Sequence, residues 1–213
     1  MTGLFGGAFD PPHAGHLALV RAALDHFRLE RLVVIPTGVA PHKDVRTPGE
    51  IRLRLAEAAF CDLPRVEVSD WELERGEPSY TVETTRWARE RWGELMFLVG
   101  ADQFAKLDTW HQPDDVLALA RLGVATRPGY DRAELLRLRE RLRDPSRVEL
   151  FEIPAVPVAS TDVRDRVARG EPIDGLVPPA VARLIGELGL YGDGQQPGEA
   201  ATLERTERGT ENR

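Results

Sequence analysis

Two histidines lie three positions apart behind a pair of glycines near the N-terminus. They belong to the segment Gly6-Gly7-Ala8-Phe9-Asp10-Pro11-Pro12-His13-Ala14-Gly15-His16, which joins an apolar run to a helical pattern. Paired glycines let the backbone approach a ligand closely. Both imidazoles can point to one side of a helix N-terminus, where N–H groups and the helix dipole favour anions. There they can donate hydrogen bonds to phosphate oxygens and take up charge in a transition state.

Other interpretations of this segment are weaker. A helical zinc pair has the pattern His-Glu-x-x-His, with histidines at i and i+4 and a third ligand. Here His13 and His16 stand at i and i+3, with no glutamate between them. The Gly-x-Gly-x-x-Gly fingerprint of dinucleotide-binding enzymes is absent. An ordinary turn with a capping histidine is the simplest alternative to a phosphate site.

Two further segments follow or precede regular elements and carry polar groups. The loop 36–43 contains prolines and a glycine and ends in a cation, Lys43. Ser79-Tyr80-Thr81 comes just before a helical pattern. Thr81 is typical of a capping region, and a plain helix cap is the alternative to a binding role.

The fourth apolar run continues into a loop that pairs an acid with aromatic groups. Gly100 allows close approach, and Asp102 can accept hydrogen bonds from ribose hydroxyls. Trp110, followed by His111, offers a flat face on which an aromatic ring of a ligand can stack. A tryptophan packed in the core is the alternative.

A second helix start carries hydroxyl groups and a guanidinium. Ser160 and Thr161 begin the pattern, and Arg164 lies one turn further on. Arginine binds phosphate in a bidentate way. Arg127, after the fifth apolar run, is a further candidate cation.

The elements that must position these groups alternate between short β-branched runs and helical periods, which predicts an α/β fold. Runs that are apolar on both sides of the pleat favour a doubly wound, mainly parallel, Rossmann-like sheet with helices on both faces. In such a sheet, ligands bind at the carboxyl ends of the strands. Strands are expected at 3–5, 32–35, 66–69, 95–99, 122–125 and 148–153. Helices are expected at 16–27, 49–60, 81–92, 113–120, 131–143, 161–169 and 178–188, the last two C-terminal to the sheet.

The composition limits the class of protein. The chain has 213 residues and a net charge of −7, so a nucleic-acid-binding protein is not expected, and any positive site must be local. Cys61 is the single cysteine, which excludes a disulfide framework and favours a reducing compartment. Without a membrane-length apolar run or a leader pattern, we expect a cytoplasmic protein with no membrane partner. Residues 1–191 form one expected domain, and 192–213 an expected disordered polar tail.

Taken together, these segments resemble the nucleotidyltransferase superfamily marked by a His-x-x-His motif, and within it the bacterial nicotinate-nucleotide adenylyltransferases. The likeness extends from Leu4 to Tyr191 and includes the Gly-x-Asp-x-Phe…Trp pattern. It implies catalytic roles for His13, His16, Lys43 and Arg164. It implies ATP binding by Gly6, Gly7, Ala8, Phe9, His13, His16, Gly100, Asp102, Ser160, Thr161 and Arg164. It implies binding of the nicotinate nucleotide by Lys43, Ser79, Tyr80, Thr81, Trp110, His111 and Arg127.

The resemblance implies transfer of an adenylyl group from ATP to nicotinate mononucleotide. A phosphate monoester has a second pKa of about 6, so the attacking oxygen is already ionised and no general base is required. Mg²⁺ is expected to arrive with ATP, without a metal site in the protein. Two alternatives stay open: transfer to another phosphorylated acceptor, such as nicotinamide mononucleotide or phosphopantetheine, and a non-catalytic nucleotide sensor. The oligomeric state, a homo-oligomer included, and contacts of Thr37 or Gly38 with substrate are open as well.

Overall fold

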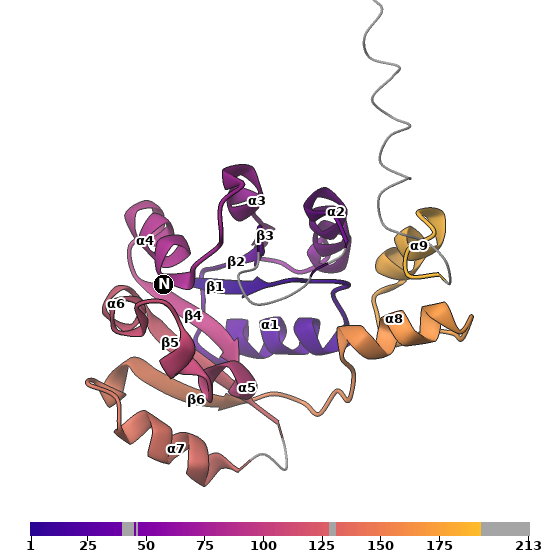
Figure 1. The fold of residues 1–213 in the computed structure, drawn as a ribbon. Helices are drawn as coiled ribbons and strands as arrows, with labels where there is room; N and C mark the ends of the chain where they lie inside the picture. The colour runs from indigo at the N-terminus through magenta and orange to yellow at the C-terminus, as the bar shows by residue number, and fades with distance from the viewer. Residues whose placement is uncertain (40–44, 46, 128–130, 193–213) are drawn as a thin grey trace, which may run out of the picture.

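The computed structural model describes residues 1–39, 45, 47–127 and 131–192. Its centre is a parallel sheet of six strands in the order β3-β2-β1-β4-β5-β6 (Figure 1). The strands are Thr2–Gly7 (β1), Arg31–Pro36 (β2), Val66–Val68 (β3), Leu95–Gly100 (β4), Arg121–Thr126 (β5) and Val148–Glu152 (β6). The strand order reverses between β1 and β4, which pair side by side. That reversal is where doubly wound sheets bind their ligands.

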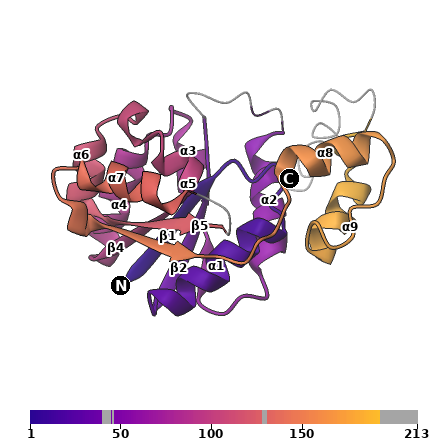
Figure 2. The same cartoon turned by 90° about the horizontal axis from the view of Figure 1, so that it is seen from below.

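Helices cover both faces of the sheet. One face carries α1 (Ala14–His26), α2 (Gly49–Phe60), α8 (Ser160–Ala168) and α9 (Pro179–Glu187). The other carries α4 (Thr81–Trp92), α6 (Pro113–Leu119) and α7 (Arg132–Glu140). Short connecting helices are α3 (Trp71–Arg75), α5 (Ala101–Phe104), η1 (Leu107–Thr109) and η2 (Pro145–Arg147). Figure 1 and Figure 2 show α9 beside α2, and the start of α8 next to the start of α1.

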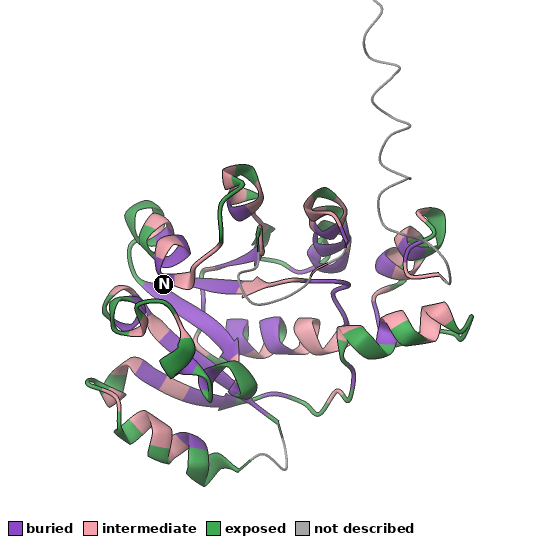
Figure 3. Cartoon of the chain, in the orientation of Figure 1, coloured by how far each residue is buried: buried purple, intermediate pink, exposed green. Residues whose placement is uncertain are grey.

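The strands are buried because their side chains alternate between two apolar cores. Phe5 and Leu98 pack among α1, α2, α8 and α9, whereas Leu4 and Phe97 pack under α4 to α7. Figure 3 shows the result, with buried strands at the centre and exposed outer helix faces. This two-sided burial explains why the strands are continuous apolar runs.

The predicted fold class is confirmed, together with all six strands and all seven predicted helices, whose ends differ by three residues at most. The helices α3 and α5 were not predicted, because four or five residues are too few to show a hydrophobic period. Within the described part of the chain, every helix is too short or too polar to span a bilayer. The predicted tail lies outside the described residues except for Gly192.

Candidate active site

A cavity of about 690 Å³ opens at the carboxyl ends of the central strands. The turn after β1, the ends of β4 and β5, the segment after β6 and the starts of α4 and α8 form its wall. Most of the residues predicted from the sequence line it, namely Gly6, Gly7, Ala8, Phe9, His13, His16, Ser79, Tyr80, Thr81, Gly100, Asp102, Trp110, His111, Arg127 and Ser160. Groups from opposite ends of the chain therefore meet at the point where the strand order reverses.

The two histidines cap the N-terminus of α1 reciprocally. His13 is the N-cap, and its Nδ1 accepts from the N–H of Gly15 at 3.2 Å. The Nδ1 of His16 accepts from the N–H of His13 at 3.1 Å. The two rings stack with centroids 3.8 Å apart and an interplanar angle of 27°. The expectation that both imidazoles lie on one side of the helix start is confirmed.

This hydrogen-bond pattern decides which ring nitrogen carries the proton. A nitrogen that accepts from a backbone N–H has no hydrogen of its own, so each neutral ring is protonated at Nε2. Burial, assisted by the positive charge of Arg127, lowers the pKa of His13 to about 4. At neutral pH, His13 is therefore an uncharged donor that can gain charge when phosphates approach.

The turn before His13 is held by the C-terminal part of the chain. Arg164 Nη1 donates to the carbonyl of Asp10 at 2.6 Å, and Ser160 Oγ donates to the carbonyl of Pro11 at 2.9 Å. The phenol of Tyr191 donates to Asp10 Oδ1 at 2.7 Å. Burial, followed by the charge of Asp10, raises the pKa of Tyr191, which keeps the phenol protonated as a donor. The helices that follow the sheet thus position residues 6–13, the segment between β1 and α1 that is called the phosphate turn below.

A second group of cavity-lining residues is aromatic. Trp110 is half-buried and meets Phe97 edge to face, with centroids 6.2 Å apart. Tyr80 and His111 lie with ring centroids 4.6 Å apart at the start of α4. Because Trp110 and Tyr80 both line the cavity, a flat ring could stack there.

Three expectations change in the structure. The plain helix cap that was the alternative for Thr81 does not form, because the N-cap of α4 is Tyr80 and it makes no side-chain capping bond. The side chain of Phe9 is only 2% exposed and packs against the ring of His16, so a nucleotide would meet its backbone. Arg164 and Thr161 do not line the cavity wall, since the guanidinium binds Asp10 and Thr161 instead.

The local positive charge is also distributed differently from the prediction. Lys43 lies outside the described residues. Arg127 and Lys106 line the cavity, although Lys106 was not among the predicted site residues. Asp102 lines the same wall, as does Glu72, an acidic residue that was not predicted to be in the site.

Two buried charges were missed from the sequence. Arg52 is 3% exposed and Glu72 is 7% exposed. Arg52 carried a signal, since it shares the apolar face of α2 with Leu55, Ala56 and Ala59 at helical spacing. Glu72 carried none, because α3 is too short for a periodic pattern.

Comparison with known proteins agrees with this geometry. A doubly wound parallel sheet with a glycine-containing turn and a helix N-terminus at the point where the strand order reverses is typical of nucleotide-binding α/β proteins. The profile of the cytidylyltransferase-like family matches residues 4–166, and the chain belongs to that family.

Curated relatives are similar over nearly their whole length. A protein of Rubrobacter xylanophilus named probable nicotinate-nucleotide adenylyltransferase is 38% identical, covering 89% of this chain and 91% of that protein. A protein of the same name from Desulfitobacterium hafniense is 41% identical, covering 89% and 94%. The high coverage of both chains means that the similarity includes the sheet and the C-terminal helices.

Solved structures agree on the fold. Nicotinic acid mononucleotide adenylyltransferase of Plasmodium falciparum, complexed with NaAD, gives a TM-score of 0.71 at 15% identity, covering 89% of this chain and 96% of that one. A putative nicotinate-nucleotide adenylyltransferase of Vibrio parahaemolyticus gives 0.64 at 21% identity, covering 90% and 95%.

Proposed function

We propose that this protein transfers the adenylyl group of ATP to nicotinate mononucleotide, forming nicotinate adenine dinucleotide and pyrophosphate in NAD biosynthesis. The observation that carries the proposal is the stacked pair of His13 and His16 at the start of α1, at the reversal point of the sheet. The relatives described above bear the same activity in their names.

The phosphate half of the site is built from donors. His13 and His16 offer Nε2–H groups, and the backbone at Gly6 and Gly7 lets phosphates come close. The start of α8, where Ser160 lines the cavity, adds a second helix N-terminus. These groups act by positioning the triphosphate and stabilising the charge that develops on it.

The acceptor half is built from rings and a third helix start. Trp110 offers the face for the pyridine ring, and the N–H groups at the start of α4, near Tyr80 and Thr81, suit its carboxylate. Arg127 adds positive charge to the cavity wall, close enough to His13 to lower its pKa.

The reaction needs no covalent intermediate on the protein. An ionised oxygen of the acceptor's phosphate attacks the α-phosphorus of ATP and forms the new P–O bond. The bond from that phosphorus to the oxygen bridging to the β-phosphorus breaks, and its electron pair leaves with pyrophosphate. No proton has to be removed from the nucleophile, since the second pKa of a phosphate monoester is about 6.

Mg²⁺ enters this proposal as part of the substrate. Among the residues that the structure describes, no three His, Cys, Asp or Glu side chains gather into a candidate metal site. Phosphate oxygens and water are ligands that Mg²⁺ prefers, so the ion fits a site in which ATP supplies most of the coordination. The ion would neutralise phosphate charge, while His13 and His16 hold the oxygens.

The test is a panel of acceptors with purified protein and MgATP, following pyrophosphate release and the dinucleotide product. We expect turnover with nicotinate mononucleotide and far less with nicotinamide mononucleotide or phosphopantetheine. Preferred turnover of another acceptor would overturn the substrate assignment. Tight ATP binding without turnover of any acceptor would instead support a nucleotide sensor.

A further inference from the structure

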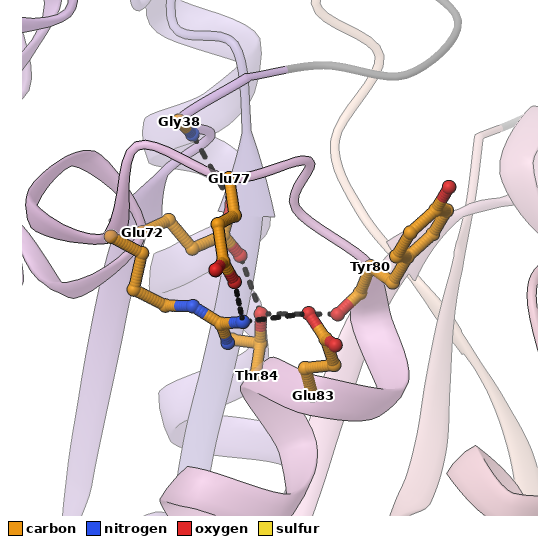
Figure 4. A network of polar contacts seen from close by, with 7 residues as sticks. Gly38, Glu72, Glu77, Tyr80, Glu83 and Thr84 are labelled. Atoms are coloured by element: carbon orange, nitrogen blue, oxygen red, sulfur yellow. Dashed lines mark hydrogen bonds and ion pairs between the residues drawn. The ribbon is translucent and has the colours of Figure 1, made fainter.

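A buried carboxylate that the reaction does not use lies in the cavity wall. Glu72, on α3, is 7% exposed and accepts a hydrogen bond from each of two separate segments. Its Oε2 accepts from the N–H of Gly38 at 3.3 Å, and its Oε1 accepts from Thr84 Oγ1 at 2.6 Å (Figure 4). The side chain of Ser79 is a third donor to the same carboxylate. One charged group therefore ties the loop after β2 to the start of α4.

The loop side of this link has little freedom to move. Arg52 donates from Nη2 to the carbonyl of Thr37 at 2.7 Å, while Glu72 accepts from the next N–H along the chain. A Cβ at Gly38 would collide with the main-chain carbonyl of Glu72 and lie 3.0 Å from Ser79 Oγ. Arg52 and Glu72, two buried groups of opposite charge, thus bind the C=O and the N–H of the same peptide group, the one that joins Thr37 to Gly38.

On its helix side, the link reaches the start of α4, which lines the part of the cavity that we propose for the acceptor. Thr84 lies one turn into α4 and is fully buried, so its hydroxyl is fixed relative to the helix axis. Ser79 directly precedes Tyr80, the N-cap of α4, and donates its N–H to the carbonyl of Val39 at 2.9 Å. Holding Ser79 and Thr84 therefore fixes the first turn of α4 on both sides.

Burial raises the pKa of Glu72 above the ordinary value of a carboxyl group, and the hydrogen bonds from Thr84, Ser79 and Gly38 offset only part of that rise. A buried carboxylate is costly unless donors satisfy it, and the donors lose their partner if the carboxylate is removed. The bonds are thus mutually dependent, and an uncharged replacement would loosen all three.

We propose that Glu72 is a positioning residue that holds the Thr37–Gly38 loop and the start of α4 at the spacing that the acceptor requires. It sets the affinity for the acceptor through Ser79, Tyr80 and Thr81, and it leaves the chemical step at the phosphates unaffected. The identity of the acceptor rests on the proposed function, whereas the positioning role rests on the geometry around Glu72.

The test is Glu72→Gln, which keeps the shape and removes the charge and one acceptor oxygen. We expect the KM for nicotinate mononucleotide to rise at least about tenfold, the scale of one lost hydrogen bond to a charged group, with kcat and the KM for ATP unchanged within about twofold. Calorimetric titration with nicotinate mononucleotide should show the same loss of affinity.

Glu83→Gln is the matched control. Glu83 is in the first turn of α4 and pairs with Arg75 at 3.1 Å, so its replacement removes one charge nearby while the three donors to Glu72 stay in place. It should behave as the wild type. Thr84→Val should raise the same KM, and adding Glu72→Gln to it should cost less than the sum of the two single changes.

Three results would overturn the proposal: equal rises in both KM values, a loss confined to kcat, or the same effect from Glu83→Gln. Failure of the proposed function would look different, because the wild type would then prefer another acceptor in the panel. The variants would be compared on that acceptor, so the positioning role is tested either way.

Discussion

Arg164 Nη1 and the carbonyl oxygen of Asp10 are hydrogen-bonded at 2.6 Å, although 154 positions separate the two residues. The bond joins α8, after the last strand, to the turn that follows the first strand. Arg164 Nη2 also reaches Thr161 Oγ1 at 3.3 Å. The guanidinium therefore acts on the turn that carries His13.

Arg164→Ala should impair catalysis because it releases that turn. We expect kcat to fall at least about tenfold, since a misplaced catalytic group is costly even without loss of contact to substrate. Arg164→Lys should recover little, because one ammonium cannot reproduce the two directed bonds of the guanidinium. Steady-state kinetics with both substrates measures this effect. Arg137→Ala, on the exposed side of α7, is the control for removing an arginine. Full recovery by lysine would mean that only the charge matters.

His16 should act through its Nε2–H group. We expect His16→Ala to lower kcat by about a hundredfold or more, the scale for one charge-stabilising donor. His16→Asn can still accept from the N–H of His13, so it should be as inactive as the alanine variant but more stable. His16→Gln, which can place a donor near Nε2, should retain more activity. Stopped-flow product formation and thermal unfolding separate these effects, and near-normal turnover by His16→Asn would contradict the role.

Trp110 should serve the acceptor and not the nucleotide donor. Trp110→Ala is expected to raise the KM for nicotinate mononucleotide about tenfold while the KM for ATP hardly changes, because stacking of a base on an aromatic ring is worth about 1–3 kcal/mol. The KM of Trp110→Phe for nicotinate mononucleotide should lie between the values of the wild type and Trp110→Ala, because phenylalanine keeps a ring. Steady-state kinetics with each substrate varied in turn measures both KM values. Equal changes in both KM values would assign Trp110 to packing against Phe97.

His13 should make stability depend on pH in one direction. Its pKa falls from 6.5 to about 4 on folding, so the unfolded chain binds the proton more tightly in that interval. The contribution is therefore present above pH 6.5 and lost as the pH falls towards 4, by about 3 kcal/mol in total. Urea unfolding of the wild type and His13→Asn between pH 4 and 7 measures the difference, with His26→Asn as the control. Parallel curves for wild type and His13→Asn would contradict the assignment.

The sequence alone determined the strands and the long helices, and most of the site residues that it predicted line the cavity. Strands such as β4 were predictable because burial on both faces makes them continuous apolar runs. The phosphate turn was predictable because its glycines and histidines are neighbours along the chain. The spacing of His13 and His16 also indicated that their rings lie on the same side of α1.

Only the tertiary structure decided how these groups are held. The guanidinium of Arg52 binds the main-chain carbonyls of Ala8 and Thr37, and every residue type has such carbonyls. Glu72 likewise takes one of its donors from the backbone, at Gly38. Helical spacing indicated that Arg52 lies on the buried face of α2, but a backbone partner has no signature in residue type, so the contacts of Arg52 and Glu72 are decided only when the chain is folded.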